Sequence, residues 1–301
     1  MIDCAIIGGG PAGLTAAIYL TRFHLSVRLF DDGNSRAALI ACTHNHAGYP
    51  GGIKGTKLLR LMHEQASDFG VTVTNAHVDA IERNGEEFVV VIDGERIDAR
   101  TVLLATGVVN NRPEMDDAEH DRALAAGLLR YCPVCDGYEV TDKRVGVIGT
   151  GDHGMREALF LRGYTADVTL IAPGAAHELD ETCVAELQAG GIAHVDGPGT
   201  PIKIADNQLS VMTAKGPMLF DSVYPALGSV IRSELAVVAG ANAAEDGCLE
   251  VDSHQRTSIP GLFAAGDVVK GLDQISHAMG EAGVAATTIR NMLDQRQRLR
   301  R

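Results

Sequence analysis

Two glycine-rich turns constrain the fold of this 301-residue chain most strongly, because each lies between a short apolar run and a helical pattern. The first turn, residues 8–13, follows the run Ile2–Ile7, and the second, residues 149–154, follows the run 144–148. A strand, a glycine-rich turn and a helix open the βαβ unit of doubly wound sheets. Two such openings, about 140 residues apart, predict an α/β protein with two Rossmann-like nucleotide-binding domains.

The remaining apolar runs place further elements along the chain. The last helical stretch carries small side chains at helical spacing, which predicts close packing against another element. We expect strands at 26–31, 71–74, 87–92, 101–107, 167–172, 208–212, 221–224 and 261–267, and helices at 14–23, 155–162 and 275–299.

Composition excludes several classes of function. The charge sum is 26 − 39 = −13, Trp is absent and aromatic residues are 4%, so the chain offers neither a phosphate-binding surface nor base-stacking platforms for nucleic acid. No apolar run reaches the roughly 20 residues of a membrane span, and Ile2–Ile7 lacks the basic flank of a signal peptide. We therefore expect a cytoplasmic protein that binds neither nucleic acid nor membrane.

The first turn has the residues that a dinucleotide needs. Gly8 permits the tight turn, Gly10 lets the backbone approach a pyrophosphate, and Gly13 lets the helix pack on the strand. Asp31 ends the next strand and is placed to accept a hydrogen bond from a ribose hydroxyl. These features fit FAD and NAD equally well. We expect the same nucleotide to contact Pro11, Ala12 and Asp32.

The pair Cys132-Pro-Val-Cys135 is the most informative feature of the middle region. Two cysteines at this spacing at a helix start can close a small disulfide ring, and the helix end favours the reactive thiolate. A zinc half-site and an inert pair are the alternatives, but zinc usually needs four ligands and no second pair completes the set, so we expect no metal. Asp136 could shuttle the proton that accompanies thiol release, or be only a helix N-terminal charge.

Four motifs resemble, in order, those of the low-molecular-weight thioredoxin reductases. They are Gly8-Gly-Gly10-Pro-Ala-Gly13, Ala105-Thr106-Gly107, Cys132-Pro-Val-Cys135-Asp136-Gly137 and the run from Thr257 to Asp267. The resemblance covers nearly the whole chain. It implies an FAD-dependent dithiol–disulfide oxidoreductase and a homodimer. It also implies domains of the three-layer ββα type: a discontinuous FAD-binding domain, 1–112 and 243–301, enclosing an NAD(P)H-binding-like domain, 113–242, that bears the dithiol.

The resemblance also assigns roles to single residues. Cys135 corresponds to the flavin-proximal thiol, Cys132 to the interchange thiol and Asp136 to the acid–base group. Asp267 corresponds to the acid that binds the ribityl chain of FAD, and the final helix places its positive end near the flavin. Further FAD contacts implied by the resemblance are Arg36, Asn45, Val78, Ala105, Thr106, Gly107, Gly266, Gln274 and Ile275.

The second turn departs from the reductase pattern. NADPH-using reductases carry a basic run after the second strand of this unit, whereas no Arg or Lys lies between Arg162 and Lys203 here. His177 stands there among acidic residues, and His153 is unusual beside the turn. We expect ordinary NADPH binding to be lost, so the donor could be ferredoxin. A second nucleotide, NAD(P)H or a second FAD, stays open, because Gly149 and Gly151 could still hold a pyrophosphate.

Several functional alternatives remain. The partner could be a thioredoxin-like protein or a small disulfide, with either direction of electron flow. An oxygen-dependent dithiol oxidase acting on a small metabolite and a flavin-binding sensor without turnover are the competing interpretations. For four further residues a flavin-site role competes with an ordinary structural one: Cys42, His44, His46 and His277.

Overall fold

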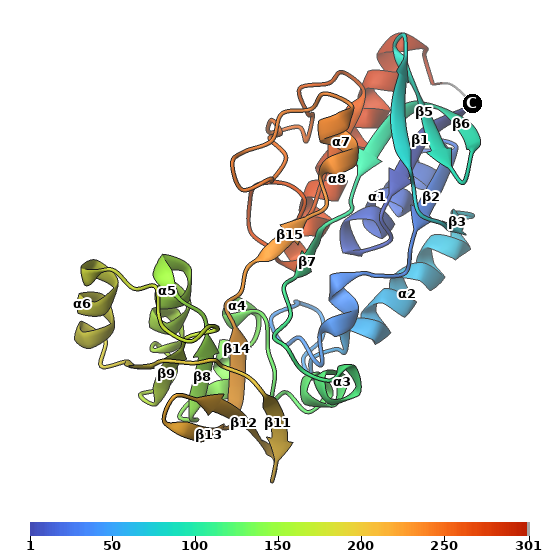
Figure 1. The fold of residues 1–301 in the computed structure, drawn as a ribbon. Coiled ribbons are helices and arrows are strands. Elements are labelled where there is room, and N and C mark those ends of the chain that lie inside the picture. The colour runs from blue at the N-terminus through green and yellow to red at the C-terminus, as the bar shows by residue number, and fades with distance from the viewer. Residues whose placement is uncertain (300–301) are drawn as a thin grey trace. The chain divides into compact units, whose positions relative to one another are not determined.

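The computed structural model describes residues 1–299, which fold into two compact units (Figure 1). Unit 1 comprises residues 1–40, 53–109 and the chain from Val230 onward, and unit 2 comprises residues 41–52 and 110–229. Both contain a parallel sheet with helices packed on it, so the predicted α/β class with two Rossmann-like sheets is confirmed. Within the described residues, no helix is long and apolar enough to cross a membrane.

Unit 1 is built on a seven-stranded sheet in the order β3-β2-β1-β6-β5-β4, with β16 also paired to β6. The parallel strands are β1 (Ile2–Ile7), β2 (Val27–Asp31), β3 (Thr72–Asn75), β6 (Glu95–Leu104) and β16 (Leu262–Ala264). The antiparallel strands are β4 (Ala80–Asn84) and β5 (Glu87–Ile92). The strand order reverses at β1, and ligands of such sheets bind at the carboxyl end of the strands at that point.

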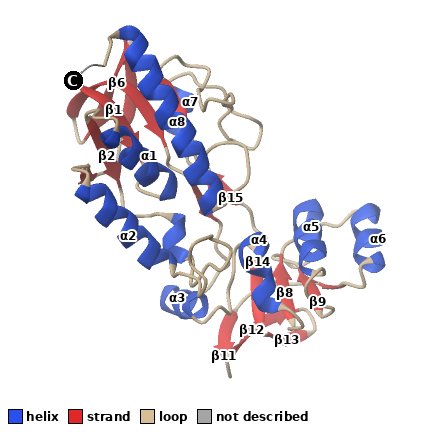
Figure 2. Ribbon diagram, turned by 180° about the vertical axis from the view of Figure 1, so that it is seen from behind, coloured by secondary structure: helices blue, strands red, loops and turns tan. Residues whose placement is uncertain are grey.

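The helices of unit 1 are α1 (Pro11–Arg22), 3₁₀ helix η1 (Arg36–Leu39), α2 (Gly55–Asp68), α7 (Glu234–Val238) and α8 (Ile275–Arg296). Helices α1 and α8 lie side by side against the sheet (Figure 2). Small side chains make this close packing possible, as the spacing in the last helix predicts. The buried residues of α8 are Ala278, Ala282, Ala285, Ala286, Ile289 and Leu293.

Unit 2 has a parallel sheet in the order β10-β9-β8-β14 and a separate antiparallel sheet, β11-β12-β13. Its strands are β8 (Val145–Ile148), β9 (Val168–Ile171), β10 (Ala193–Val195), β11 (Ile202–Ala205), β12 (Gln208–Thr213), β13 (Gly216–Phe220) and β14 (Ser222–Pro225). Its helices are α3 (Asp117–Ala125), α4 (Pro133–Asp136), 3₁₀ helix η2 (Gly137–Val140), α5 (Gly151–Leu161) and α6 (Glu181–Ala189).

Alternation along the buried strands produces the three layers of unit 2. Val147 and Leu170 pack in one core cluster with residues of α5 and α6, whereas their neighbours Ile148 and Ile171 pack in another with residues of β12 and β13. Successive side chains of a strand point to opposite faces, so a parallel strand covered on both faces is apolar throughout. The antiparallel sheet and the two helices therefore sandwich the parallel sheet, as the ββα prediction describes.

The unit boundaries differ from the predicted ones at two places. Residues 230–242, predicted to end the inserted domain, group with unit 1, because Ala236 and Ala241 are buried in its core. The chain passes between the units at β7 (Val108–Asn110) and β15 (Ser229–Ile231), which pair with each other. Residues 41–52, predicted to belong to the first domain, group with unit 2.

The core of unit 2 allows a direct test of this packing. Phe220 is fully buried, and a Cβ on Gly146 would lie 3.1 Å from its ring. We expect Phe220→Ala to lower the free energy of unfolding by about 3–5 kcal/mol, because it leaves a cavity between the two sheets. Leu219→Ala, at a neighbouring position that is 40% exposed, is the control and should cost much less. Denaturant unfolding measures both, and equal effects would contradict the layer assignment.

Candidate active site

The first glycine-rich turn of unit 1 is held by contacts that only glycine allows. A Cβ on Gly13 would lie 1.9 Å from the carbonyl oxygen of Gly8, and Gly8 itself has φ +107°. The side chain of Asp31 accepts a hydrogen bond from the backbone N–H of Gly9 at 3.0 Å. The predicted ribose acceptor therefore also fixes the turn, which brings helix α1 directly onto strand β1.

The start of α1 offers backbone donors to an anion. Its N-cap is Gly10, no side chain caps it, and Pro11 occupies the first helical position. A Cβ on Gly10 would meet one heavy atom at 3.2 Å, the hydroxyl oxygen of Ser35. An uncapped helix start after a strand at the switch point of the sheet fits a dinucleotide pyrophosphate. The residues at this turn therefore fit FAD.

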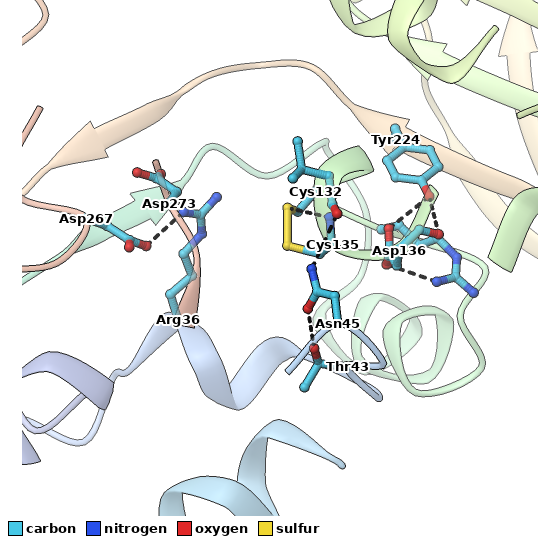
Figure 3. Close-up of a disulfide and its surroundings, with 11 residues drawn as sticks. Arg36, Thr43, Asn45, Cys132, Cys135, Asp136, Tyr224, Asp267 and Asp273 are labelled. Atoms are coloured by element: carbon cyan, nitrogen blue, oxygen red, sulfur yellow. Dashed lines mark hydrogen bonds and ion pairs between the residues drawn. A yellow bond between two sulfur atoms is a disulfide. The ribbon is translucent and has the colours of Figure 1, made fainter. Parts of the chain in front are cut away.

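A second group of charges lies at the same sheet edge, after β16 (Figure 3). The guanidinium of Arg36 pairs with Asp267 at 3.0 Å and with Asp273 at 2.7 Å. Burial, and next the charge of Asp273, raise the pKa of Asp267, while Arg36 lowers it. A carboxyl group held by one cation and easily protonated is suited to bind a hydroxyl-rich chain such as the ribityl group.

The other predicted FAD contacts of unit 1 lie at or near strand ends and helix starts, except Val78, which lies in the loop between β3 and β4. Asp32 pairs with Arg232 at 3.3 Å, and the Thr106 hydroxyl donates to the carbonyl oxygen of Arg232. Gln274 is the N-cap of α8, so the positive end of the α8 helix dipole lies at this residue. The remaining predicted contacts are Ala12, Val78 and Ala105, all buried, and Gly107, Gly266 and Ile275.

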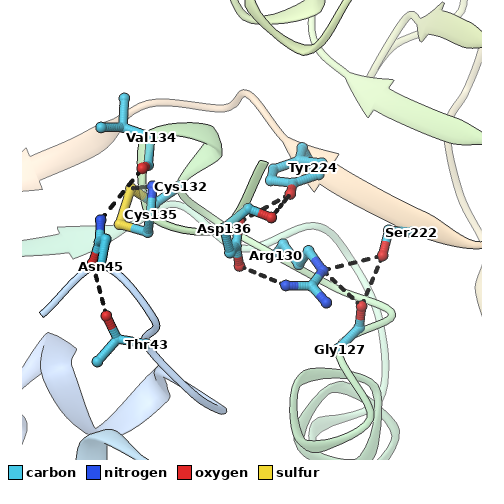
Figure 4. Close-up of polar contacts among 10 residues, drawn as sticks. All are labelled: Thr43, Asn45, Gly127, Arg130, Cys132, Val134, Cys135, Asp136, Ser222 and Tyr224. Carbon is cyan, nitrogen blue, oxygen red and sulfur yellow. Dashed lines mark hydrogen bonds and ion pairs between the residues drawn. A yellow bond between two sulfur atoms is a disulfide. The ribbon is translucent and has the colours of Figure 1, made fainter. Parts of the chain in front are cut away.

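In unit 2, Cys132 and Cys135 form a disulfide at the start of α4. Pro133 opens the helix, and the backbone N–H of Cys135 donates to the sulfur of Cys132 at 3.1 Å (Figure 4). A hydrogen bond from a backbone N–H stabilises a thiolate more than a neutral thiol. This contact places a backbone N–H donor at the sulfur of Cys132.

Asp136, next in the chain, is held in a buried polar network (Figure 4). Its carboxylate pairs with Arg130 at 2.9 Å and accepts a hydrogen bond from the Tyr224 hydroxyl at 2.9 Å. Arg130 also donates to the carbonyl oxygen of Gly127 at 2.9 Å. Burial raises the pKa of Asp136, and Arg130 partly offsets that rise. The carboxyl group can therefore hold and release a proton closer to neutral pH than an exposed aspartate.

The segment 41–52 supplies a further contact to the disulfide helix within unit 2. The side-chain amide of Asn45 donates to the carbonyl oxygen of Val134 at 3.4 Å and accepts from the Thr43 hydroxyl at 2.8 Å (Figures 3 and 4). Asn45, predicted as an FAD contact, thus lies against the redox pair of unit 2.

The four residues for which a flavin-site role competes with a structural one lie in two places, three in the segment 41–52 and one on α8. Cys42 and His44 both approach Gly52, whose Cβ would lie 2.7 Å from an atom of each. The ring of His46 stacks on Tyr49 at 5.6 Å between centroids. In unit 1, His277 pairs with Glu281 at 3.0 Å.

The second glycine-rich turn is tightly packed and covered. A Cβ on Gly154 would lie 2.8 Å from the carbonyl carbon of Gly149, so only glycine fits at this position. The backbone N–H of Glu178 donates to the Thr150 hydroxyl at 2.6 Å, and the Glu178 carbonyl oxygen lies 3.6 Å from the Cβ position of Gly151. The segment after β9 therefore lies against the turn.

Charge at this second turn is unfavourable for a phosphate. Arg156 pairs with Asp152 in the same helix at 2.8 Å, so an acidic side chain stands beside this cation. Burial lowers the pKa of His177, which keeps its ring neutral. The residues here do not fit the 2′-phosphate of NADPH. Among the described residues, no cluster of His, Cys, Asp or Glu could hold a metal ion.

Comparison with known proteins covers both units. The family described as pyridine nucleotide-disulphide oxidoreductase matches residues 2–282. A thioredoxin reductase from Mycolicibacterium smegmatis is 32% identical over 286 residues, which is 89% of this chain and 88% of the relative. The crystal structure of HlmI matches with TM-score 0.88 and 30% identity over 98% of this chain and 93% of that chain. A thioredoxin reductase from Streptococcus pyogenes MGAS5005 matches with TM-score 0.87 and 28% identity, over 98% and 99% of the two chains.

The contact at the first turn yields a test of cofactor binding. We expect Gly13→Ala to destabilise unit 1 by about 1–3 kcal/mol and to lower its flavin content, because the added methyl group forces α1 away from the turn. Gly280→Ala in α8 is the matched control, since a Cβ there meets nothing within 4 Å. Flavin absorbance per protein measures the effect, and full flavin content in Gly13→Ala would contradict it.

Proposed function

Because the chain belongs to the pyridine nucleotide-disulphide oxidoreductase family, we propose that it moves electron pairs between FAD and the Cys132–Cys135 disulfide. The chain is a flavin disulfide oxidoreductase of the thioredoxin reductase type, with FAD as its cofactor. FAD, when bound, supplies two-electron redox chemistry. The observation that carries the proposal is the disulfide, followed directly by the buried carboxyl group of Asp136.

We propose the roles of the three residues by likeness to the thioredoxin reductases, and the hydrogen bonds of Cys132 and Asp136 support them. Cys132, whose sulfur receives the backbone N–H, exchanges with the external disulfide or dithiol. Cys135 exchanges electrons with the flavin. Asp136 gives a proton to the departing sulfur and takes it back in the reverse direction. It can do so because burial raises the pKa of its carboxyl group.

The partner is a thioredoxin-like protein or another disulfide that can approach the exposed side of the pair. Val134 is 47% exposed and Tyr138 is 80% exposed, so apolar surface flanks the cysteines. Such surface suits a partner that buries apolar area around its own disulfide. Relatives named thioredoxin reductase support the thioredoxin type, and we propose a cytoplasmic homodimer by the same likeness.

The electron donor is not NADPH bound in the ordinary way. Support comes from the second turn, where the backbone of Glu178 lies against Gly151, and from the chain after β9, which carries no Arg or Lys before Lys203. We propose reduced ferredoxin or another flavin as the donor, since neither requires a phosphate clamp in unit 2.

An oxygen-dependent dithiol oxidase is the second candidate. The lack of basic residues for the NADPH phosphate also favours this oxidase, because an oxidase needs no NADPH. Electrons would enter from a small dithiol through Cys132 and leave to oxygen through FAD. Peroxide formed from oxygen and a dithiol, without turnover of thioredoxin, distinguishes this candidate from the first.

Replacement of the cysteines tests the redox pair. In the absence of oxygen, dithiothreitol should reduce the flavin of the wild type, whereas Cys132→Ser and Cys135→Ser should slow this reduction by about a hundredfold or more. Cys248→Ser is the control, because burial raises the pKa of Cys248 to about 11 and makes it unreactive. Stopped-flow flavin absorbance measures the rates, and unchanged rates in both serine variants refute the proposal.

The donor is tested with the same signal. We expect NADPH to leave the flavin oxidised on the timescale on which dithiothreitol reduces it, because no basic side chain after β9 would hold its 2′-phosphate. NADH, which lacks that phosphate, is titrated for comparison. Titration with reduced ferredoxin follows in the same instrument. Rapid and complete bleaching by micromolar NADPH shows that the donor assignment is wrong.

A further inference from the structure

The segment between β16 and α8, residues 265–274, carries both carboxylates that pair with Arg36 (Figure 3). Asp267 lies near the start of this segment and Asp273 near its end. Two side chains of α8 contact the same segment at two further points. These contacts connect the final helix to the turn that carries Asp267.

The first of these side chains is Glu281, which binds the turn at Gly266. Its Oε2 accepts a hydrogen bond from the backbone N–H of Gly266 at 2.7 Å, and its side chain is only 10% exposed. Gly266 has φ +82°, and a Cβ there would lie 3.0 Å from the Cβ of Ala12 and 3.5 Å from that of Ala278. The turn therefore has little room between α1 and α8, and a buried carboxylate holds its N–H.

The second side chain is His277, which fixes the carboxylate of Glu281. Its Nε2 lies 3.0 Å from Oε1 of Glu281, within hydrogen-bond distance, so the two carboxylate oxygens have different partners. The two residues are four positions apart and share one face of the helix. The same Nε2 would lie 3.0 Å from a Cβ on Gly271, so the imidazole also lies against the segment 265–274.

The contact at Gly266 acts on the residue that follows it. Gly266 and Asp267 share a peptide bond, so the hydrogen bond to Glu281 restrains the backbone from which the Asp267 side chain extends. Electrostatics connects the two acids as well: burial and Asp273, and to a smaller extent Glu281, raise the pKa of Asp267, while Arg36 lowers it. Asp267 is therefore oriented through its side chain by Arg36 and through its backbone by Glu281.

We propose that Glu281, held by His277, is a positioning residue for FAD binding: it fixes the turn at Gly266 so that Asp267 faces the cofactor in one orientation. The inference rests on the candidate FAD site of the proposed function, in which Asp267 binds the ribityl chain. Without Glu281 the turn would sample other conformations, and only a fraction of the protein would be competent to bind. The apparent dissociation constant of FAD rises by the reciprocal of that fraction.

The test removes FAD from the full chain and titrates each apoprotein with FAD, with flavin fluorescence giving the Kd. We expect Glu281→Leu to raise the Kd about tenfold or more, because it leaves the N–H of Gly266 without its charged acceptor. Glu281→Gln keeps an amide oxygen that can accept the same bond, and its Kd should stay within about threefold of the wild type. Glu64→Leu on α2 is the matched control, since Glu64 pairs with Arg60 at the same spacing on an exposed surface and should leave the Kd unchanged.

His277→Ala provides the second arm, and it stands even if Glu281→Leu does not fold, because the His277 side chain is 42% exposed. We expect its Kd to rise about threefold, because the Glu281 side chain regains rotamer freedom. The double variant, His277→Ala with Glu281→Leu, should have the Kd of Glu281→Leu alone, because His277 acts through Glu281. Denaturant unfolding of each apoprotein runs in parallel, since a purely structural role would lower the free energy of unfolding and leave the Kd unchanged.

Three outcomes overturn the inference: a Glu281→Leu Kd equal to that of the wild type, an unchanged Kd in His277→Ala, or losses that multiply in the double variant. Failure of the proposed function is separate. It appears as flavin bleaching by dithiothreitol that survives serine at both Cys132 and Cys135, whatever the affinity for FAD.

Discussion

The ion pair between Arg130 and Asp136 is the interaction on which the redox end of unit 2 depends. Their side chains are 15% and 19% exposed, and breaking such a pair costs about 3–5 kcal/mol because a charge stays buried alone. Arg130 is fixed in turn by Gly127 and by the hydroxyl of Ser222. The acid that follows the disulfide is therefore held by the fold, and its proton affinity reflects the opposition between burial and one fixed cation.

In unit 1 the candidate FAD site depends on the carboxyl ends of parallel strands, which lie together at one edge of the sheet. Strands β1, β6 and β16 are neighbours in the parallel sheet, so the turn after β1 and the residues after β16 share one edge. A Cβ on Gly266 would lie 3.0 Å from the Cβ of Ala12, which shows how closely the last strand's turn approaches the start of α1. Segments far apart in the chain thus supply the helix end for a pyrophosphate and, through Asp267 and Arg36, the charges for a polyhydroxyl chain.

The sequence predicted the parts of this molecule that depend on local pattern. Both glycine-rich turns, most core strands and the cysteine pair followed from short motifs. The partners of Asp136 did not, because Tyr224 lies 88 positions away and meets it only when β14 joins the sheet. The grouping of residues 230–242 with unit 1 likewise depends on tertiary packing.

The two glycine-rich turns show why that motif does not by itself identify a nucleotide site. In both, the third glycine is required by the approach of the helix to the first, with Cβ positions only 1.9 Å and 2.8 Å from backbone atoms. Strand–helix packing therefore preserves the motif with or without a ligand. What differs is the surroundings. No side chain caps the start of either helix, but the first turn of α1 has no acidic residue, whereas that of α5 carries Asp152, and the Thr150 hydroxyl there accepts a hydrogen bond from the backbone of Glu178. A carboxylate in the first turn opposes an anion at the same helix end, so the charges around a turn, and not its glycines, decide what it favours.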